Sequence, residues 1–460
     1  MKPLLTWIDR NKNKIWFSLG LQLFILGLLL IFMEPGFENS LRRETLPGAL
    51  TEAVSFQNGL LRAFYQTVYG FCGSLPWYTL LQVLLLLLAF SAVTCVILRN
   101  IERRQGLFVV LVMMAFFGYE CYIRMQYTKT AAVLSAASFF LIIYGSEKKE
   151  DQMKSLVPGV LLGSFGFLYS NTQFLICALL MIWFGAVWLL RKEKKKSGGE
   201  RNRKSIIIYL GTLGVMAVLI SGFWKADQMM YARTQQWQMD REKYTLREHL
   251  RDYGFPEYEQ NKERYENLGI SEKDLKQYQK KGKNQKQDPL EELSVDTMKT
   301  LAEAKPRERL SKALILLFLN RFSILWFQSG TFICFLLLAV FWIFLEKHDR
   351  GTFIMLLAEG VLTGAMYFCM FYRKRNSCSE MDLGFWFALC LVLCLCITGK
   401  SWRLSGKMKA LFLVTVLILN QSRWYSSWRL PPKTAKEKAK QEKYVGPFGL
   451  VEGAFELPEE

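Results

Sequence analysis

The chain has 460 residues, of which 51% are hydrophobic, and a formal net charge of +19 at pH 7. Its hydrophobic residues are concentrated in about eleven blocks that carry almost no charge, most of them close to the roughly 20 residues that span the hydrocarbon core of a bilayer. So many blocks cannot all be core helices of a soluble fold, so the pattern excludes a soluble protein and predicts an all-α polytopic transmembrane bundle.

The positive charge lies in short segments beside the apolar blocks, such as "RNIERR" and "RKEKKKSGGERNRK". Membrane proteins carry such segments on the cytoplasmic side, where anionic lipid headgroups attract them. We therefore expect the lipid bilayer as the partner of these basic segments, in preference to RNA or DNA, and predict no nucleic-acid binding.

The predicted spans begin from a cytoplasmic N-terminus, which the basic "DRNKNK" marks. Alternation then places both basic loops inside as well. After the seventh span, alternation places the basic "FYRKRNSCSEMD" outside, against the charge rule. The count of the last three spans is therefore left open by one span. The predicted spans are 15–33, 77–98, 106–123, 130–145, 156–170, 173–190, 205–223, 323–345, 352–371, 384–398 and 408–420.

These spans divide the chain into four regions. Residues 1–223 form an N-terminal transmembrane region of about seven spans, with a long outer loop at 34–76. Residues 224–312 form an extracytoplasmic helical domain. Residues 313–421 form a C-terminal transmembrane region of about four spans, and residues 422–460 form a polar tail.

Turn and cap residues predict the helices of the extracytoplasmic domain. Gly254 and Pro256 end its first helix, because the residue before a proline avoids the helical region. Gly269 caps the end of a second helix. Ser271 opens a third, with Asp274 three residues on in a weak capping box. A fourth helix, in "DPLEELSVDTMKTLAEA", leads back to the membrane. The core of this domain is thin and rich in Tyr and Leu, so we expect it to pack on the spans or on the first outer loop.

Several kinds of chemistry are excluded by missing motifs. The sequence has two histidines and no HExxH, no GxxxxGK[ST] phosphate loop and no GxSxG nucleophile elbow. We therefore predict no histidine-based metal site and no self-contained ATP-driven pump. Few charges fall within or near the spans. Of these, Glu120 and Glu359 are candidate relay residues of a transporter, and the alternative places them at a helix end or facing a polar bundle interior.

Carboxylates and arginines of the outer segments are the other candidates. Glu34 and Glu38 follow the first span, and Arg247 and Asp252 lie in the extracytoplasmic domain. A carboxylate at the membrane surface can deprotonate an acceptor hydroxyl while an arginine binds a phosphate with a two-pronged contact, as transfer from a lipid-phosphate-linked substrate requires. The alternative is that these are charged loops in water.

Three pieces in order resemble a group of uncharacterised bacterial polytopic membrane proteins. They are "FQNGLLRAFYQTVYGFCGSLPWY", "QYTKTAAVLSAASFFLI" and an R…DYG-x-P-x-Y…Y…G-I-S pattern, which starts at Arg247 and includes Asp252 and Tyr253. The resemblance covers roughly the first 275 residues. It implies a bacterial plasma membrane as the location.

The layout of that group is similar to that of GT-C glycosyltransferases, which use polyprenyl-phosphate sugars. The resemblance implies Glu34 and Glu38 as catalytic residues, Arg247, Asp252 and Tyr253 as substrate-binding residues, and no cofactor apart from a divalent cation if the chain is GT-C-like. The group opens its first outer loop with a pair of acids, whereas this chain has "MEPGFE". This departure leaves a second hypothesis open, a non-catalytic transporter or envelope-assembly protein.

Overall fold

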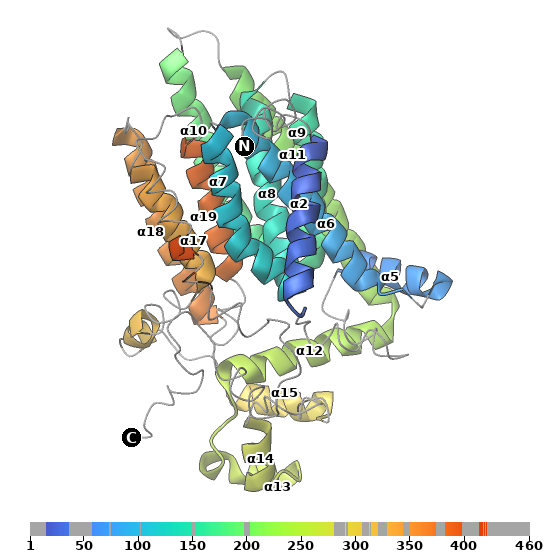
Figure 1. The fold of residues 1–460 in the computed structure, drawn as a ribbon. Coiled ribbons are helices and arrows are strands. Elements are labelled where there is room, and N and C mark those ends of the chain that lie inside the picture. Colours follow the sequence, from blue (N-terminus) through green and yellow to red (C-terminus); the bar gives the residue numbers. More distant parts are fainter. Residues whose placement is uncertain are drawn as a thin grey trace.

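The computed structural model describes residues 15–35, 58–72, 75–101, 103–148, 152–196, 203–279, 290, 293–305, 312, 314–320, 329–343, 350–373, 382–397, 414–416, 418 and 420. Within these ranges every regular element is a helix. Figure 1 shows most of them side by side in one bundle, with a small group of helices beyond one end of it. The predicted all-α bundle is therefore confirmed.

Seven of the described helices are long and apolar enough to cross a membrane. They are α2 (Ile15–Phe32), α6 (Trp77–Asn100), α7 (Arg103–Met113) continued by the π-helical segment η1 (Met114–Ile123), α8 (Tyr127–Glu147), α10 (Asn171–Lys196), α11 (Arg203–Arg233) and α18 (Arg350–Arg373).

None of the other four predicted spans is among these seven helices. Two further apolar helices, α17 (Gly330–Ile343) and α19 (Asp382–Ile397), are shorter. The predicted fifth span forms α9 (Gln152–Tyr169), which packs in the bundle. The predicted last span, 408–420, falls largely outside the described residues. The count of about eleven spans thus stays a prediction.

Helix α8 forms the centre of the bundle, and its residues from Thr130 to Ser146 are all buried. Its neighbour α9 approaches closely because glycines face serines across the contact. A Cβ atom added at Gly166 would lie 2.4 Å from Ser135 Oγ, and one at Gly163 would lie 2.5 Å from Ser138 Oγ. Small residues at such a contact let two membrane helices pack backbone against backbone.

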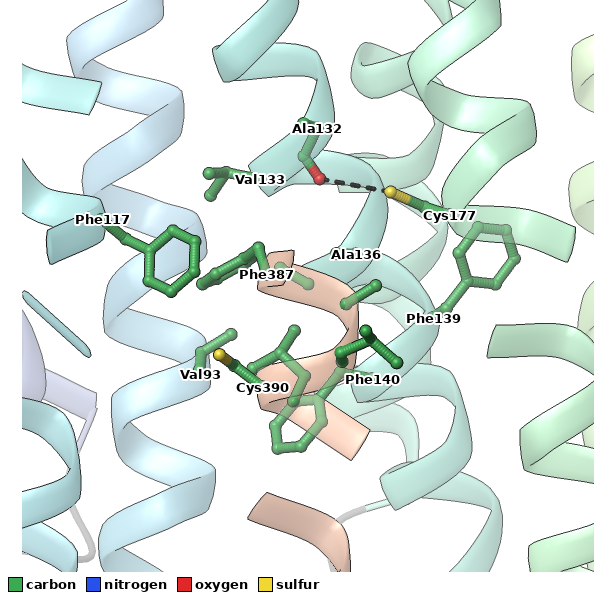
Figure 2. Close-up of a cluster of buried hydrophobic side chains, with 14 of the residues drawn as sticks. Val93, Phe117, Ala132, Val133, Ala136, Phe139, Phe140, Cys177, Phe387 and Cys390 are labelled. Atoms are coloured by element: carbon green, nitrogen blue, oxygen red, sulfur yellow. Dashed lines mark hydrogen bonds between the residues drawn. The ribbon is translucent and has the colours of Figure 1, made fainter. Parts of the chain in front are cut away.

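Helix α19 is buried over its whole length, between α6, η1, α8 and α10. In Figure 2, Phe387 of α19 points toward Phe117, and their ring centroids are 4.9 Å apart. The Cys177 thiol donates to the carbonyl of Ala132 over 3.6 Å. A helix that is apolar on all sides is typical of such a buried position.

Four helices of the predicted domain lie beyond the bundle in Figure 1: α12 (Gln235–Tyr253), α13 (Lys262–Asn267), α14 (Glu272–Gln279) and α15 (Val295–Ala304). The predicted helix ends agree with the structure. Gly254 and Gly269 adopt φ angles of 77° and 67°, which favour glycine. The Ser271 amide donates to Asp274 Oδ2 over 3.0 Å, as in a capping box.

One end of the bundle carries a helix that lies across it, α5 (Gly59–Phe71), which projects sideways in Figure 1. Helix α2 ends and α6 begins at this end, and the small domain lies beyond it. Asn58 caps α5 by accepting a hydrogen bond from the Leu60 amide over 3.0 Å. We call this end of the bundle the α5 end.

Candidate functional site

The first contact between the bundle and the small domain is an ion pair. Arg62 of α5 donates through Nη2 to Asp240 Oδ2 of α12 over 2.8 Å. The guanidinium carbon of Arg62 also lies 4.4 Å from the ring centroid of Trp237. The Arg62 side chain is only 2% exposed, so the pair and the ring enclose a charge that would otherwise be solvated.

A second ion pair stands beside the first. Asp227, near the end of α11, accepts from Arg241 Nη2 of α12 over 2.8 Å. Its other oxygen accepts from the amide of Gly59 over 2.7 Å, at the N-terminus of α5. A carboxylate there is stabilised by the positive end of the helix dipole. The guanidinium of Arg241 lies over the ring of Tyr231, 3.6 Å from its centroid.

We name Arg62, Asp227, Asp240 and Arg241 the junction cluster. Its two arginines and two aspartates balance in charge. Arg62 uses Nη2 for Asp240, whereas Nε and Nη1 have no hydrogen-bond partner among the described residues. Buried donors of this kind favour an anionic oxygen as their partner. The Arg241 side chain is 38% exposed, so the cluster is reachable from one side.

Tyrosine side chains join α5 to helices α9 and α6 of the bundle. The hydroxyls of Tyr65 and Tyr169 lie 2.6 Å apart, which joins α5 to the end of α9. The ring of Tyr65 meets that of Tyr78 edge-on, with 5.2 Å between centroids. Burial, followed by the neighbouring Tyr169, raises the pKa of Tyr65 well above its usual value of about 10, so this hydroxyl stays neutral.

Glu34 lies at the α5 end, just after α2, and is exposed. The preceding Met33 packs against Tyr119 and Ile123 of η1, which fixes the end of α2. Glu38, the second predicted catalytic carboxylate, lies outside the described residues.

Glu120 lies close to the same end of η1 and forms an ion pair with Lys129 at 2.8 Å. Lys129 also donates to the carbonyl of Arg124 over 3.0 Å. Of the two interpretations of Glu120, a relay residue or a residue at a helix end, this geometry favours the second, because a paired carboxylate is already neutralised.

The predicted substrate-binding residues lie further along α12. Arg247 follows Arg241 by six residues, about 9 Å along the helix. Its guanidinium lies 5.5 Å from the ring centroid of Tyr244 on the same helix. Asp252 is buried, and Tyr253 packs its ring against His249 at 4.8 Å. The contacts of α12 with α5 and α11 described above come from its first two turns instead.

Sequence reasoning thus missed the members of the junction cluster. Arg62 lies in the quoted "FQNGLLRAFYQTVYGF" piece, where it is the one charged residue in an otherwise uncharged stretch. Trp237 and Arg241 are four residues apart on one face of α12, a spacing that could have indicated a contact surface. Nothing in the sequence shows that these faces meet.

Within the part of the chain that the structure describes, no three His, Cys, Asp or Glu side chains are grouped to hold a metal ion. The divalent cation that the GT-C resemblance implies therefore has no ligand set among these residues, and we derive no step through it.

No protein-family model matches this sequence, and neither the curated proteins nor the solved structures show a significant match.

Proposed function

We propose that this chain is an integral membrane transferase of the GT-C-like kind, which uses a lipid-phosphate-linked sugar at the α5 end of the bundle. The observation that carries the proposal is the ion pair of Arg62 with Asp240. It joins α5, which follows the first span, to α12, which follows α11. This contact supports the placement of Glu34 and the arginines of α12 on the same side of the membrane. GT-C-like transfer needs these groups on the same side of the membrane.

In this proposal Glu34 is the base that deprotonates the acceptor hydroxyl, and it is exposed at the end of α2. Arg241, partly exposed, contacts the lipid phosphate, and the buried Arg62 supports it. These two residues take the role that the sequence suggested for Arg247. Asp252 and Tyr253 then shape the small domain.

The proposal includes a topology. The N-terminus is cytoplasmic, and the α5 end with the small domain faces the outside of a bacterial plasma membrane. In this topology, helix α9, the shorter helices α17 and α19 and the segment 408–420 bring the number of spans to about eleven. Helix α10 ends and α11 begins at the opposite end of the bundle from α5, and in the sequence this connection carries the basic "RKEKKKSGGERNRK", which supports this orientation.

The test replaces Glu34 by Gln and Arg241 by Met in the full chain, in cells whose surface carries a polyprenyl-sugar-dependent glycan. Removal of a general base lowers a rate about 10²- to 10⁴-fold, so we expect the glycan to be lost in both variants. The matched control is Glu257→Gln, because Glu257 is an exposed carboxylate in the small domain. An unchanged glycan in normally expressed Glu34→Gln would overturn the proposal.

A second candidate function, a non-catalytic transporter, is favoured by one observation. The carboxyl group of Glu359 is fully buried in the middle of α18, without a hydrogen-bond partner among the described residues. Ionisable residues inside membrane spans commonly belong to transport pathways. A phenotype that is lost in Glu359→Gln and kept in Glu34→Gln would favour this function over the transferase.

A further inference from the structure

Glu359 occupies an unusual position for a carboxyl group. It lies in the middle of α18, with 0% of its surface exposed, and both of its carboxyl oxygens lack a hydrogen-bond partner within the described ranges. The opposite face of α18 is exposed and apolar. Its large exposed side chains are Phe353, Ile354, Leu357 and Val361. Glu359 therefore points into the bundle, while the lipid-facing side of the helix is hydrophobic.

Burying a carboxylate without a hydrogen-bond partner is strongly unfavourable, so the carboxyl group is neutral and protonated in this conformation. The described elements around α18 contribute one cation and two aromatic side chains. Arg191 of α10 lies with Nη1 3.1 Å from the sulfur of Met355, one turn before Glu359. Trp342 of helix α17 stacks on Phe353 of α18. Phe318 of the short segment 314–320 packs on Tyr367 of α18.

The buried face of α18 carries further polar groups. The Thr363 hydroxyl donates to the backbone carbonyl of Glu359 over 2.8 Å. Tyr367 follows one turn later, and its hydroxyl donates to Asp382 at the start of α19. Successive members Glu359, Thr363 and Tyr367 are four residues apart, so they lie on one face with about 6 Å between them along the axis. One water molecule spans such a gap with two hydrogen bonds.

This line of groups runs toward the α5 end. Asp382 belongs to the first turn of α19, and two residues later the Gly384 carbonyl lies 3.9 Å from the Cys177 sulfur. Cys177 lies in the second turn of α10, which begins just after Tyr169, the partner of Tyr65 in α5. The start of α19 and the end of α18 are therefore at the same end as α5.

We infer that Glu359 is a reversible proton-binding site inside the bundle, connected to the α5 end through Thr363, Tyr367 and Asp382. On release, the O–H bond of Glu359 breaks and its proton passes along this line to the Asp382 carboxylate and then to water. Glu359 is left as a carboxylate, which Arg191, near Met355, attracts from the other side. Loading reverses the step, and no electron is transferred. This inference is independent of the proposed transferase.

The test is reaction with dicyclohexylcarbodiimide, an apolar reagent that adds to a protonated carboxyl group and leaves a stable N-acylurea. The full chain in lipid nanodiscs is treated between pH 5 and pH 10, and labelled peptides are quantified by mass spectrometry. We expect Glu359 to be labelled at low pH, with labelling falling about tenfold per pH unit above its pKa. Glu120, paired with Lys129, is the internal control and stays nearly unlabelled.

Two variants sharpen the result. Asp382→Asn interrupts the line but leaves Glu359 in place, so we expect Glu359 to be labelled with a shifted pH profile. Glu359→Asp retains a carboxyl group at the same position, so we expect it to keep pH-dependent labelling. Glu359 that stays unlabelled in the native chain yet reacts after unfolding would overturn the inference. So would labelling that does not change with pH, or protection by Na⁺ at constant pH, which would indicate a metal-cation site instead.

Discussion

The guanidinium of Arg62 and the carboxylate of Asp240 lie 2.8 Å apart although 178 residues separate them in the chain. One belongs to the helix that lies across the end of the bundle, and the other to the first helix of the small domain. Because Arg62 is buried and Asp240 is 23% exposed, the pair is intermediate between a surface and a core salt bridge. It is one of two ion pairs that join the small domain to the bundle.

Replacing Asp240 by Asn tests the contribution of this pair to stability. The substitution leaves Arg62 as a buried charge without its counter-charge. We expect the free energy of unfolding to fall by about 1–3 kcal/mol, less than for a fully buried pair because Asp240 is partly solvated. Thermal unfolding of the purified chain in detergent measures the change. Glu272→Gln, which breaks the exposed pair with Lys276, is the control and leaves the unfolding temperature unchanged. Equal shifts in both variants would show that the buried pair has no special weight.

Alanine substitutions at two glycines should change stability in opposite directions. A Cβ atom at Gly166 would lie 2.4 Å from Ser135 Oγ and 3.1 Å from the Ser135 amide nitrogen, so Gly166→Ala must push α8 and α9 apart. We expect a loss of about 1–3 kcal/mol. Gly211 has nothing within 4 Å of that position, so Gly211→Ala gains helix propensity of about 0.5–1 kcal/mol. Unfolding temperatures of the two variants check the signs, and a stabilised Gly166→Ala would contradict the close α8–α9 contact.

The small domain should lose stability in strong alkali because of Tyr265. Its hydroxyl donates to the Pro256 carbonyl over 2.7 Å, and burial raises its pKa from 10.0 to about 12. The folded state therefore holds the proton more tightly than the unfolded state. This stability is complete below pH 10 and is lost as the pH rises to about 12, by roughly 2–3 kcal/mol.

Tyr265→Phe is the control for that pH dependence. It removes the titrating hydroxyl together with its hydrogen bond, so the variant is less stable at neutral pH but has a flatter profile between pH 10 and pH 12. Absorbance of the tyrosinate form and helical circular dichroism, recorded on the same samples, report titration and unfolding separately. An identical alkaline loss in both proteins would assign it to other groups.

The hydrogen bond from Gln22 Nε2 to Thr94 Oγ1, 2.8 Å long, joins α2 to α6 within the bundle. Gln22 Oε1 has no partner among the described residues. Gln22→Leu therefore removes one bond together with an unsatisfied acceptor, and we expect a change below about 1 kcal/mol. Thr94→Val leaves the whole Gln22 amide unsatisfied and should cost about 1–3 kcal/mol. Unfolding of both variants in detergent checks the order, and a larger loss in Gln22→Leu would contradict it.

Much of the candidate site was beyond sequence reasoning for a physical reason. Glu34 could be placed at the end of the first span, since apolar length alone sets where α2 ends. Arg247 was predicted to bind the phosphate of a substrate on the same side of the membrane as Glu34. In the structure the first two turns of α12 face the bundle, where Arg241 pairs with Asp227 and Asp240 pairs with Arg62. Which face of a helix meets another depends on packing between distant segments, and a single sequence does not encode that choice locally.

The sequence by itself determined the class of fold and the local helix ends. Runs of apolar residues must form helices in a bilayer, where each backbone group needs an internal partner, and Gly254 and Gly269 end helices because they adopt positive φ. Only the tertiary structure decided that α5 lies across the bundle, that Arg62 meets Asp240, and that Glu359 is enclosed with no hydrogen-bond partner among the residues described. These features arise from contacts between segments far apart in the chain, whose energies depend on three-dimensional packing rather than on the pattern within any one helix.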